Sequence, residues 1–172
     1  MNRIRRAVPW ALVSLSALFA ILGLGDVVIG IAFEPTTALA ITGKTVDEIR
    51  SESEAGYAVI DYVYRGGGLT LTLFATLMTI VLAIPYRRAQ WWAWWTAWLL
   101  PVWAGAVFAF FVGQGTAPGQ SISGVAWSGA VFAIAIAALL LVDLGRFRSE
   151  AHALTSSGGQ RTFVGAGEGV EG

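Results

Sequence analysis

Four long apolar runs dominate the chain and are separated by polar or turn-rich segments. They cover about residues 8–33, 66–86, 92–113 and 124–144. Each run is close to the roughly 20 residues that an α-helix needs to cross the hydrocarbon core of a bilayer. A strand of a membrane barrel needs only about 10 residues of alternating polarity, and these runs are longer and uniformly apolar. The pattern predicts four membrane-spanning helices.

The first run follows the basic residues Arg3, Arg5 and Arg6, a start that is also typical of a secretory signal. The apolar core of a signal peptide is usually about 7–15 residues long, and this run is much longer. The Ala38-Leu39-Ala40 triplet resembles a cleavage site but lies late. An uncleaved membrane helix is therefore favoured over a removed signal.

Arginines mark one side of the predicted membrane domain. They precede the first helix, separate the second from the third, and follow the fourth: Arg3, Arg5, Arg6, Arg87, Arg88, Arg146 and Arg148. The opposite side has a net acidic loop over 34–65 and an uncharged connection over 113–123. Because cytoplasmic loops are enriched in Lys and Arg, both termini are predicted in the cytoplasm. Ten Arg against one Lys is typical of a GC-rich prokaryotic genome, so the expected location is a bacterial inner membrane.

The loop over 34–65 is expected to form a short helical cap outside the membrane. Thr45 and Glu48 have the spacing of a capping box, which predicts a helix over 46–54 that Gly56 ends or bends. Tyr57, Ile60 and Tyr64 then share one helical face, either at the interface or on an upward extension of the second membrane helix. This cap is a lid that closes the outer end of the helices, or a docking surface.

Asp26 is the most informative polar residue, because an acid inside an apolar run is costly and by default a functional hypothesis. At 1.5 Å per residue it lies roughly 27 Å above Val8, and Arg65 lies roughly 31 Å above Tyr86. The similar depths predict an Asp26–Arg65 ion pair with Asp61 as a second partner. The pair either locks two helices together or lines a polar binding site with Tyr57 and Tyr64.

Two further features are expected near the inner boundary. Asp143 and Arg146, three residues apart on the fourth helix, are predicted to pair locally. A stripe of indoles on the third helix, with one more on the first, is expected to anchor the protein at the headgroups: Trp91, Trp94, Trp95, Trp98 and Trp10. An aromatic ligand pocket is the alternative interpretation of that stripe.

The third helix should kink at Pro101, which lacks the N–H that would bond to the carbonyl of Ala97. Small residues also repeat every four positions on three helices: Gly105, Ala109 and Gly113; Gly129, Ala133 and Ala137; Gly68, Thr72 and Thr76. Such stripes let helices approach closely, within the chain or against another subunit.

Composition narrows the functional classes. The chain is 56% hydrophobic and only 13% charged, with no net charge, so a nucleic-acid partner is not expected. It has no Cys, and its single His152 lies in the C-terminal tail, so no metal, cofactor or catalytic residues are expected. The expected domains are a membrane domain over 1–148 and a disordered cytoplasmic tail over 149–172, because the tail lacks apolar periodicity.

Several local motifs together resemble those of a group of bacterial four-helix membrane proteins whose activity is unknown. The motifs are Gly25-Asp26, Ile41-Thr42-Gly43-Lys44-Thr45, Glu48-Ile49-Arg50 and Trp98-Leu99-Leu100-Pro101. The resemblance covers about residues 9–146 and implies the architecture but no activity. The architecture is also similar to that of four-helix sterol-isomerase-like proteins, but the acid and histidine pattern of their catalytic members is absent, and fold does not imply function.

The fold class predicted from these observations is all-α: a four-helix transmembrane bundle, up-down-up-down, with a short helical cap in the first extracytoplasmic loop. The leading functional hypothesis is a non-enzymatic accessory subunit whose partners are the bilayer and another membrane protein or a second copy. One alternative is a lipid or lipophilic small-molecule binding protein with a site at the outer ends of the first two helices. The other is an oligomeric transporter or channel protomer.

Overall fold

The computed structural model describes residues 2–119 and 124–164 of the chain. Every regular element in those ranges is helical, and they contain no strand. Four stretches are long and apolar enough to cross a membrane: Ala7–Phe33, Glu54–Tyr86, Trp91–Gln114 and Trp127–Ser149. The four predicted helices are confirmed, and they indicate a multi-pass membrane protein.

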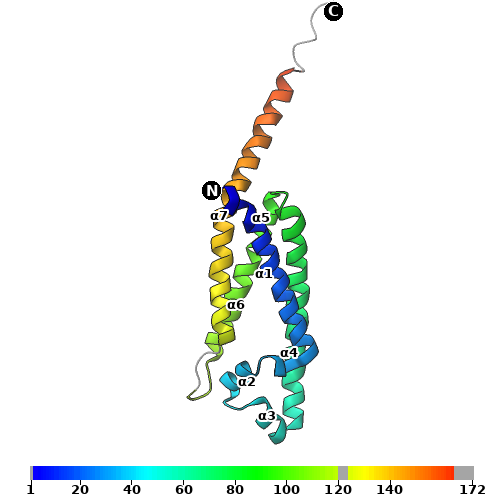
Figure 1. Ribbon diagram of the computed structural model, residues 1–172, viewed down its shortest axis with the longest axis vertical. Helices are drawn as coiled ribbons and strands as arrows, with labels where there is room; N and C mark the ends of the chain where they lie inside the picture. Colours follow the sequence, from blue (N-terminus) through cyan, green and yellow to red (C-terminus); the bar gives the residue numbers. More distant parts are fainter. Residues whose placement is uncertain (1, 120–123, 165–172) are drawn as a thin grey trace, which may run out of the picture.

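The elements follow one another along the chain with short connections. They are α1 (Asn2–Ile29), the 3-10 turn η1 (Gly30–Phe33), α2 (Pro35–Thr42), α3 (Val46–Glu52), α4 (Glu54–Val81), the π-helical turn η2 (Leu82–Tyr86), α5 (Trp91–Ala97), α6 (Leu99–Gln114) and α7 (Gly124–Val164). Figure 1 shows α2 and α3 at the end of the molecule away from the N-terminus. We call that end the loop end and the opposite one the terminal end.

The helices α1 and α4 pack against each other through two glycines. A Cβ on Gly68 would lie 2.5 Å from the Cβ of Asp26 and 2.7 Å from the carbonyl oxygen of Gly23. A Cβ on Gly23 would lie 2.7 Å from Oγ1 of Thr72. Nearby, the buried Ser16 hydroxyl donates a hydrogen bond to the carbonyl of Ala75 over 3.0 Å. Gly68 and Thr72 of the small, partly polar stripe of α4 therefore serve packing within the chain, whereas Thr76 is exposed.

The main apolar core lies toward the terminal end. Its buried members come from α1, α4, η2, α5, α6, α7 and the connection before α5: Val8, Leu12, Met78, Leu82, Tyr86, Ala89, Ala93, Trp94, Ala97, Leu100, Ile136, Leu140 and Phe147. A second, smaller cluster lies at the loop end, where Val46, Tyr57, Ile60 and Tyr64 pack against Ile31, Ala38 and Ile49. The predicted shared face of the α4 tyrosines is thus confirmed.

The α4 helix starts earlier than the second apolar run. Ser53 caps its first turn by accepting a hydrogen bond from the N–H of Gly56 over 3.0 Å. The helix then continues without a break through Arg65 into the apolar segment. The predicted end or bend at Gly56 is therefore wrong. The chain turns at Ser53 instead, and the tyrosine face extends the membrane helix.

The third apolar run is interrupted at Trp98, between α5 and α6. Pro101 has no N–H, so the bond that it would make to the carbonyl of Ala97 is missing. The N–H of Val102 bonds to the carbonyl of Trp98 over 3.2 Å and restarts the helix. The helix is therefore interrupted one turn before Pro101, in the region where a kink was predicted.

The segment after the fourth apolar run differs from the expectation. α7 continues as one helix to Val164 and projects beyond the other helices (Figure 1). Residues 149–164 are therefore helical and not disordered, while residues 165–172 of the expected tail lie outside the described residues. The segment holds the strong helix formers Ala151, Ala153 and Leu154 and no Pro, so α7 has no breaker at the membrane boundary.

The α3 helix begins with the predicted capping box. The N–H of Thr45 donates to Oε2 of Glu48 over 2.7 Å, and Oγ1 of Thr45 accepts from the N–H of Glu48 over 3.3 Å. These bonds, made chiefly to the backbone of Thr45, hold the pKa of Glu48 below its usual value. The cap is formed while Glu48 is ionised.

Acidification is expected to loosen α3 selectively. A lowered pKa in the folded state means that the cap stabilises α3 above the usual carboxyl pKa and that this contribution is lost as the pH falls below it. Hydrogen exchange of the α3 amides, corrected for intrinsic rates, should therefore show falling protection at acid pH. In Glu48→Gln, which can still accept a hydrogen bond from the N–H of Thr45 but cannot ionise, protection should depend less on pH. Equal pH profiles for the two proteins would contradict this role of the cap.

Candidate functional site at the loop end

Arg65 caps the C-terminal end of α1. Its Nη1 donates to the carbonyls of Val27 and Val28 over 2.7 and 2.9 Å, and Nη2 donates to that of Ile29 over 3.4 Å. Its Nε donates to Oδ2 of Asp61 over 2.7 Å. The last carbonyl groups of a helix have no hydrogen-bond partner within the helix, and they lie at the negative end of its dipole. A cation therefore stabilises them.

This arrangement corrects the predicted Asp26–Arg65 ion pair, although the Asp61–Arg65 pair is confirmed. Rise along a helix places two residues at the same depth but does not determine how each helix is rotated. α1 presents its terminal carbonyls to Arg65, while Asp26 approaches α4 at Gly68. In the part of the chain that the structure describes, the buried Oδ1 of Asp26 has no hydrogen-bond partner.

A glycine makes this turn possible. Gly30 has φ +74°, the left-handed region that ends many helices and that residues with a Cβ rarely adopt. A Cβ there would lie 1.8 Å from Oδ1 of Asp61, which instead accepts a hydrogen bond from the N–H of Ile31 over 3.1 Å. Asp61 and Arg65 therefore bind the backbone on both sides of Gly30, so they are structural as well as candidate binding residues.

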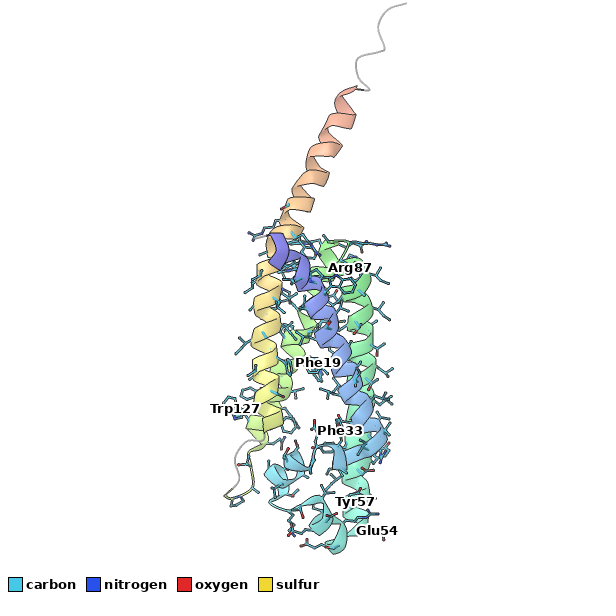
Figure 2. The ribbon with its side chains drawn as sticks, viewed as in Figure 1. Phe19, Phe33, Glu54, Tyr57, Arg87 and Trp127 are labelled. Atoms are coloured by element: carbon cyan, nitrogen blue, oxygen red, sulfur yellow. The ribbon has the colours of Figure 1, made fainter. Side chains whose placement is uncertain are left out.

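A cleft of about 340 Å³ opens beside this pair, between α3 and the start of α4. It is lined by Arg50, Glu54, Tyr57, Ala58, Asp61, Tyr62 and Arg65. The guanidinium of Arg50 lies 5.1 Å from the centre of the Tyr57 ring. Figure 2 shows Glu54 and Tyr57 at the loop end, far from Arg87 at the opposite end.

The cleft contains three of the five predicted binding residues, namely Tyr57, Asp61 and Arg65, and separates them from Asp26 and Tyr64. Sequence reasoning missed Arg50, Glu54 and Tyr62. Arg50 and Glu54 belong to different helices, and no local spacing shows that the turn at Ser53 brings those helices together.

Asp26 and Tyr64 belong to a second group, with Glu34 and Thr37, outside the lining of the cleft. Burial raises the pKa of Glu34, and the charge of Asp26 raises it further, while the neighbouring Thr37 hydroxyl acts in the opposite direction. Thr37 is fully buried, and its Oγ1 forms no hydrogen bond of normal geometry in the described part of the chain. Glu34 and Thr37 lie outside the motifs found in the sequence, and only the fold of η1 and α2 brings them to Asp26.

The terminal end holds a buried ionic cluster. Asp143 is fully buried, and its Oδ2 lies 3.6 Å from Nη1 of Arg146, so the predicted local pair is confirmed. Arg146 also donates to the carbonyl of Tyr86 and lies 5.4 Å from the centre of that ring. The π-helical turn η2, which contains Pro85, ends at Tyr86. The pair therefore connects α7 to the end of α4, which local spacing did not show.

In the indole stripe the ring of Trp94 contacts those of Trp91, Trp95 and Trp98. Trp94 is buried, and its Nε1 donates to the carbonyl of Leu140 over 3.2 Å. Trp91 and Trp95 are exposed, as is Trp10, over which Arg87 lies at 4.2 Å. Trp94 is thus a core residue, and only the exposed indoles are suited to anchoring.

The fold and these clusters define a multi-pass membrane protein with charged groups concentrated near the two ends of its apolar helices. No family model, curated protein or solved structure matches the chain. The resemblance to bacterial four-helix membrane proteins therefore stays a prediction, and the function has to be argued from the geometry of the chain's own residues.

Proposed function

We propose that this chain is a non-enzymatic protein of a bacterial inner membrane that binds a phospholipid headgroup in the cleft at its loop end. Its four helices would form an up-down-up-down bundle with both termini in the cytoplasm. The segment with α2 and α3 would be a cap on the outer side. The observation that supports the binding function best is the cleft lined by Arg50 and the α4 tyrosines.

The depth of the cleft favours a headgroup. From Tyr86 to Arg65, η2 and α4 together rise roughly 31 Å, close to the roughly 30 Å thickness of a hydrocarbon core. The residues from Glu54 to Arg65 would therefore start at the outer boundary of that core and continue through the headgroup region. Tyr62 and Val63, which are exposed on this part of α4, would face the lipid.

The charges of the cleft favour a zwitterionic headgroup. Two arginines and two acids line it, so its formal charge is zero. Arg65 and Asp61 already bind each other and the end of α1, whereas Arg50 has no ion pair within the described ranges. The guanidinium of Arg50 can bind a phosphate with two parallel hydrogen bonds. Glu54 can then bind the ammonium of an ethanolamine group.

Arg50→Gln is expected to weaken phosphatidylethanolamine binding about tenfold, since a hydrogen bond to a charged group is worth about 1.5–3 kcal/mol. The measurement is native mass spectrometry of the full chain in detergent, titrated with phosphatidylethanolamine and, separately, with phosphatidylglycerol. Arg88→Gln is the matched control, because it removes an exposed arginine at the terminal end. The proposal is wrong if both variants bind like the unchanged protein, or if phosphatidylglycerol binds as tightly as phosphatidylethanolamine.

A second candidate function, an accessory subunit of a larger assembly, is favoured by one face of α6. A Cβ on Gly105 or Gly113 would meet nothing within 4 Å, and the nearby Ala106 and Ala109 are exposed. Faces of small residues let another helix approach closely in a membrane. Purification in mild detergent followed by mass spectrometry distinguishes the two functions. A stoichiometric protein partner supports the accessory subunit, and lipid alone supports the headgroup-binding protein.

A further inference from the structure

Asp26 and Glu34 are two neighbouring carboxyl groups that form no ion pair with any residue that the structure describes. The charge of Asp26 acts directly on Glu34, and both groups are partly buried. Among the described residues, the ion pairs join Lys44 to Glu52, Arg65 to Asp61 and Arg146 to Asp143. Two partly buried negative charges are therefore left uncompensated, which is costly unless something neutralises them.

Arg65 is not available for that purpose. Its Nε, Nη1 and Nη2 all donate hydrogen bonds, to Asp61 and to the last carbonyls of α1. Turning the guanidinium toward Asp26 would leave those carbonyls without partners at the membrane boundary. Within the described residues no ion pair compensates these carboxyl groups, so an ion from outside the chain can do so.

Two buried oxygens near these carboxyl groups also lack partners. Thr37 is fully buried, and its Oγ1 lies beside the Glu34 carboxyl and the Tyr64 hydroxyl, but it forms no hydrogen bond of normal geometry in the described part of the chain. Oδ1 of Asp26 is buried and likewise without a partner in the described ranges. Buried polar atoms in proteins are nearly always satisfied, so such orphaned oxygens indicate a missing water or ion.

We propose that Asp26 and Glu34 bind a hard divalent cation such as Ca²⁺, with the hydroxyl of Thr37 as a neutral oxygen ligand. All three ligand atoms are oxygens, the type that Ca²⁺ and Mg²⁺ prefer. Two carboxylates neutralise one divalent ion. No group of three or more His, Cys, Asp or Glu side chains gathers within the described residues, so the site has few charged ligands and its affinity should be modest. The site is separate from the lipid cleft and does not depend on it.

The test is thermal unfolding of the purified full chain in detergent, after chelation and with added CaCl₂ or MgCl₂. The unfolding temperature should rise with one or both salts, with half-saturation at about 0.1–1 mM, the range of weak extracellular calcium sites. Glu34→Gln and Asp26→Asn should abolish this rise. Without divalent ions, both variants should unfold at or above the temperature of the unchanged chain, because they relieve the repulsion.

Asp47→Asn is the control, since Asp47 is an exposed acid of the same loop and its loss should leave the response intact. NaCl at equal ionic strength separates a bound ion from general screening. The proposal is overturned if NaCl gives the same rise, if Glu34→Gln and Asp26→Asn keep it, or if only acidification stabilises the unchanged chain. The last outcome would mean that the two carboxyl groups share a proton and bind no metal.

Discussion

Gly68→Ala is expected to destabilise the protein by about 3 kcal/mol, the upper end of the usual cost of overpacking. The added methyl would lie 2.5 Å from the Cβ of Asp26, 2.7 Å from the carbonyl oxygen of Gly23 and 2.9 Å from the amide nitrogen of Val27. Two of these atoms belong to the backbone of α1 and cannot move away by rotating a side chain. Relief therefore requires α1 and α4 to separate, which also removes the neighbouring contacts.

The matched control is Gly67→Ala, one position earlier on the same helix. A Cβ there would meet nothing within 4 Å. Alanine is favoured over glycine within helices by about 1 kcal/mol, so this variant should be neutral or more stable. Reversible unfolding in mixed micelles of increasing SDS fraction measures both variants. If they behave alike, the close approach at Gly68 does not hold the two helices together.

Arg146→Met is expected to lower the free energy of unfolding by about 3 kcal/mol, because it removes one charge partner of a buried carboxylate. Asp143 is fully buried, and only 24% of the Arg146 side chain is exposed, so water would screen the remaining carboxylate weakly. The carbonyl of Tyr86 would also lose its donor. Because these groups join α7 to the end of α4, the variant should loosen the terminal end, and unfolding in mixed micelles measures the loss.

Arg148→Met is the appropriate control, because Arg148 is exposed on the same helix and its loss changes the net charge equally. The free energy of unfolding of this control should stay within about 0.5 kcal/mol of that of the unchanged protein. The double variant Arg146→Met with Asp143→Asn should recover part of the loss, since it also removes the buried negative charge. A double variant as unstable as the sum of the two single ones would show that the pair is not coupled.

The sequence predicted best what depends on neighbouring residues. Apolar runs long enough to cross a bilayer identified the four helices, and three-residue spacing identified the Thr45 cap and the Asp143–Arg146 pair. Each of these features depends on residues within one helix or one turn. It therefore does not depend on how that element packs against the others. Pro101 belongs to the same class, because its missing N–H breaks the helix wherever that helix packs.

The prediction was wrong or incomplete where the answer depends on how helices are rotated and joined. Depth placed Asp26 and Arg65 at one level, but the left-handed turn at Gly30 presents the carbonyls of α1 to Arg65. Arg50 reaches the cleft only because α3 folds back beside α4. The partner of Tyr86 likewise comes from a helix about 60 residues away in the chain.

The order of helix contacts also determines how the protein can assemble during synthesis. α1 packs mainly on α4, and α6 packs mainly on α7. The first pair is complete, including its crossing at Gly23 and Gly68, before the ribosome has made the second. The core at the terminal end needs both pairs and can close only when Leu140 and Phe147 of α7 arrive. Synthesis that stops before α7 would thus leave a formed α1–α4 hairpin with the apolar side of that core uncovered.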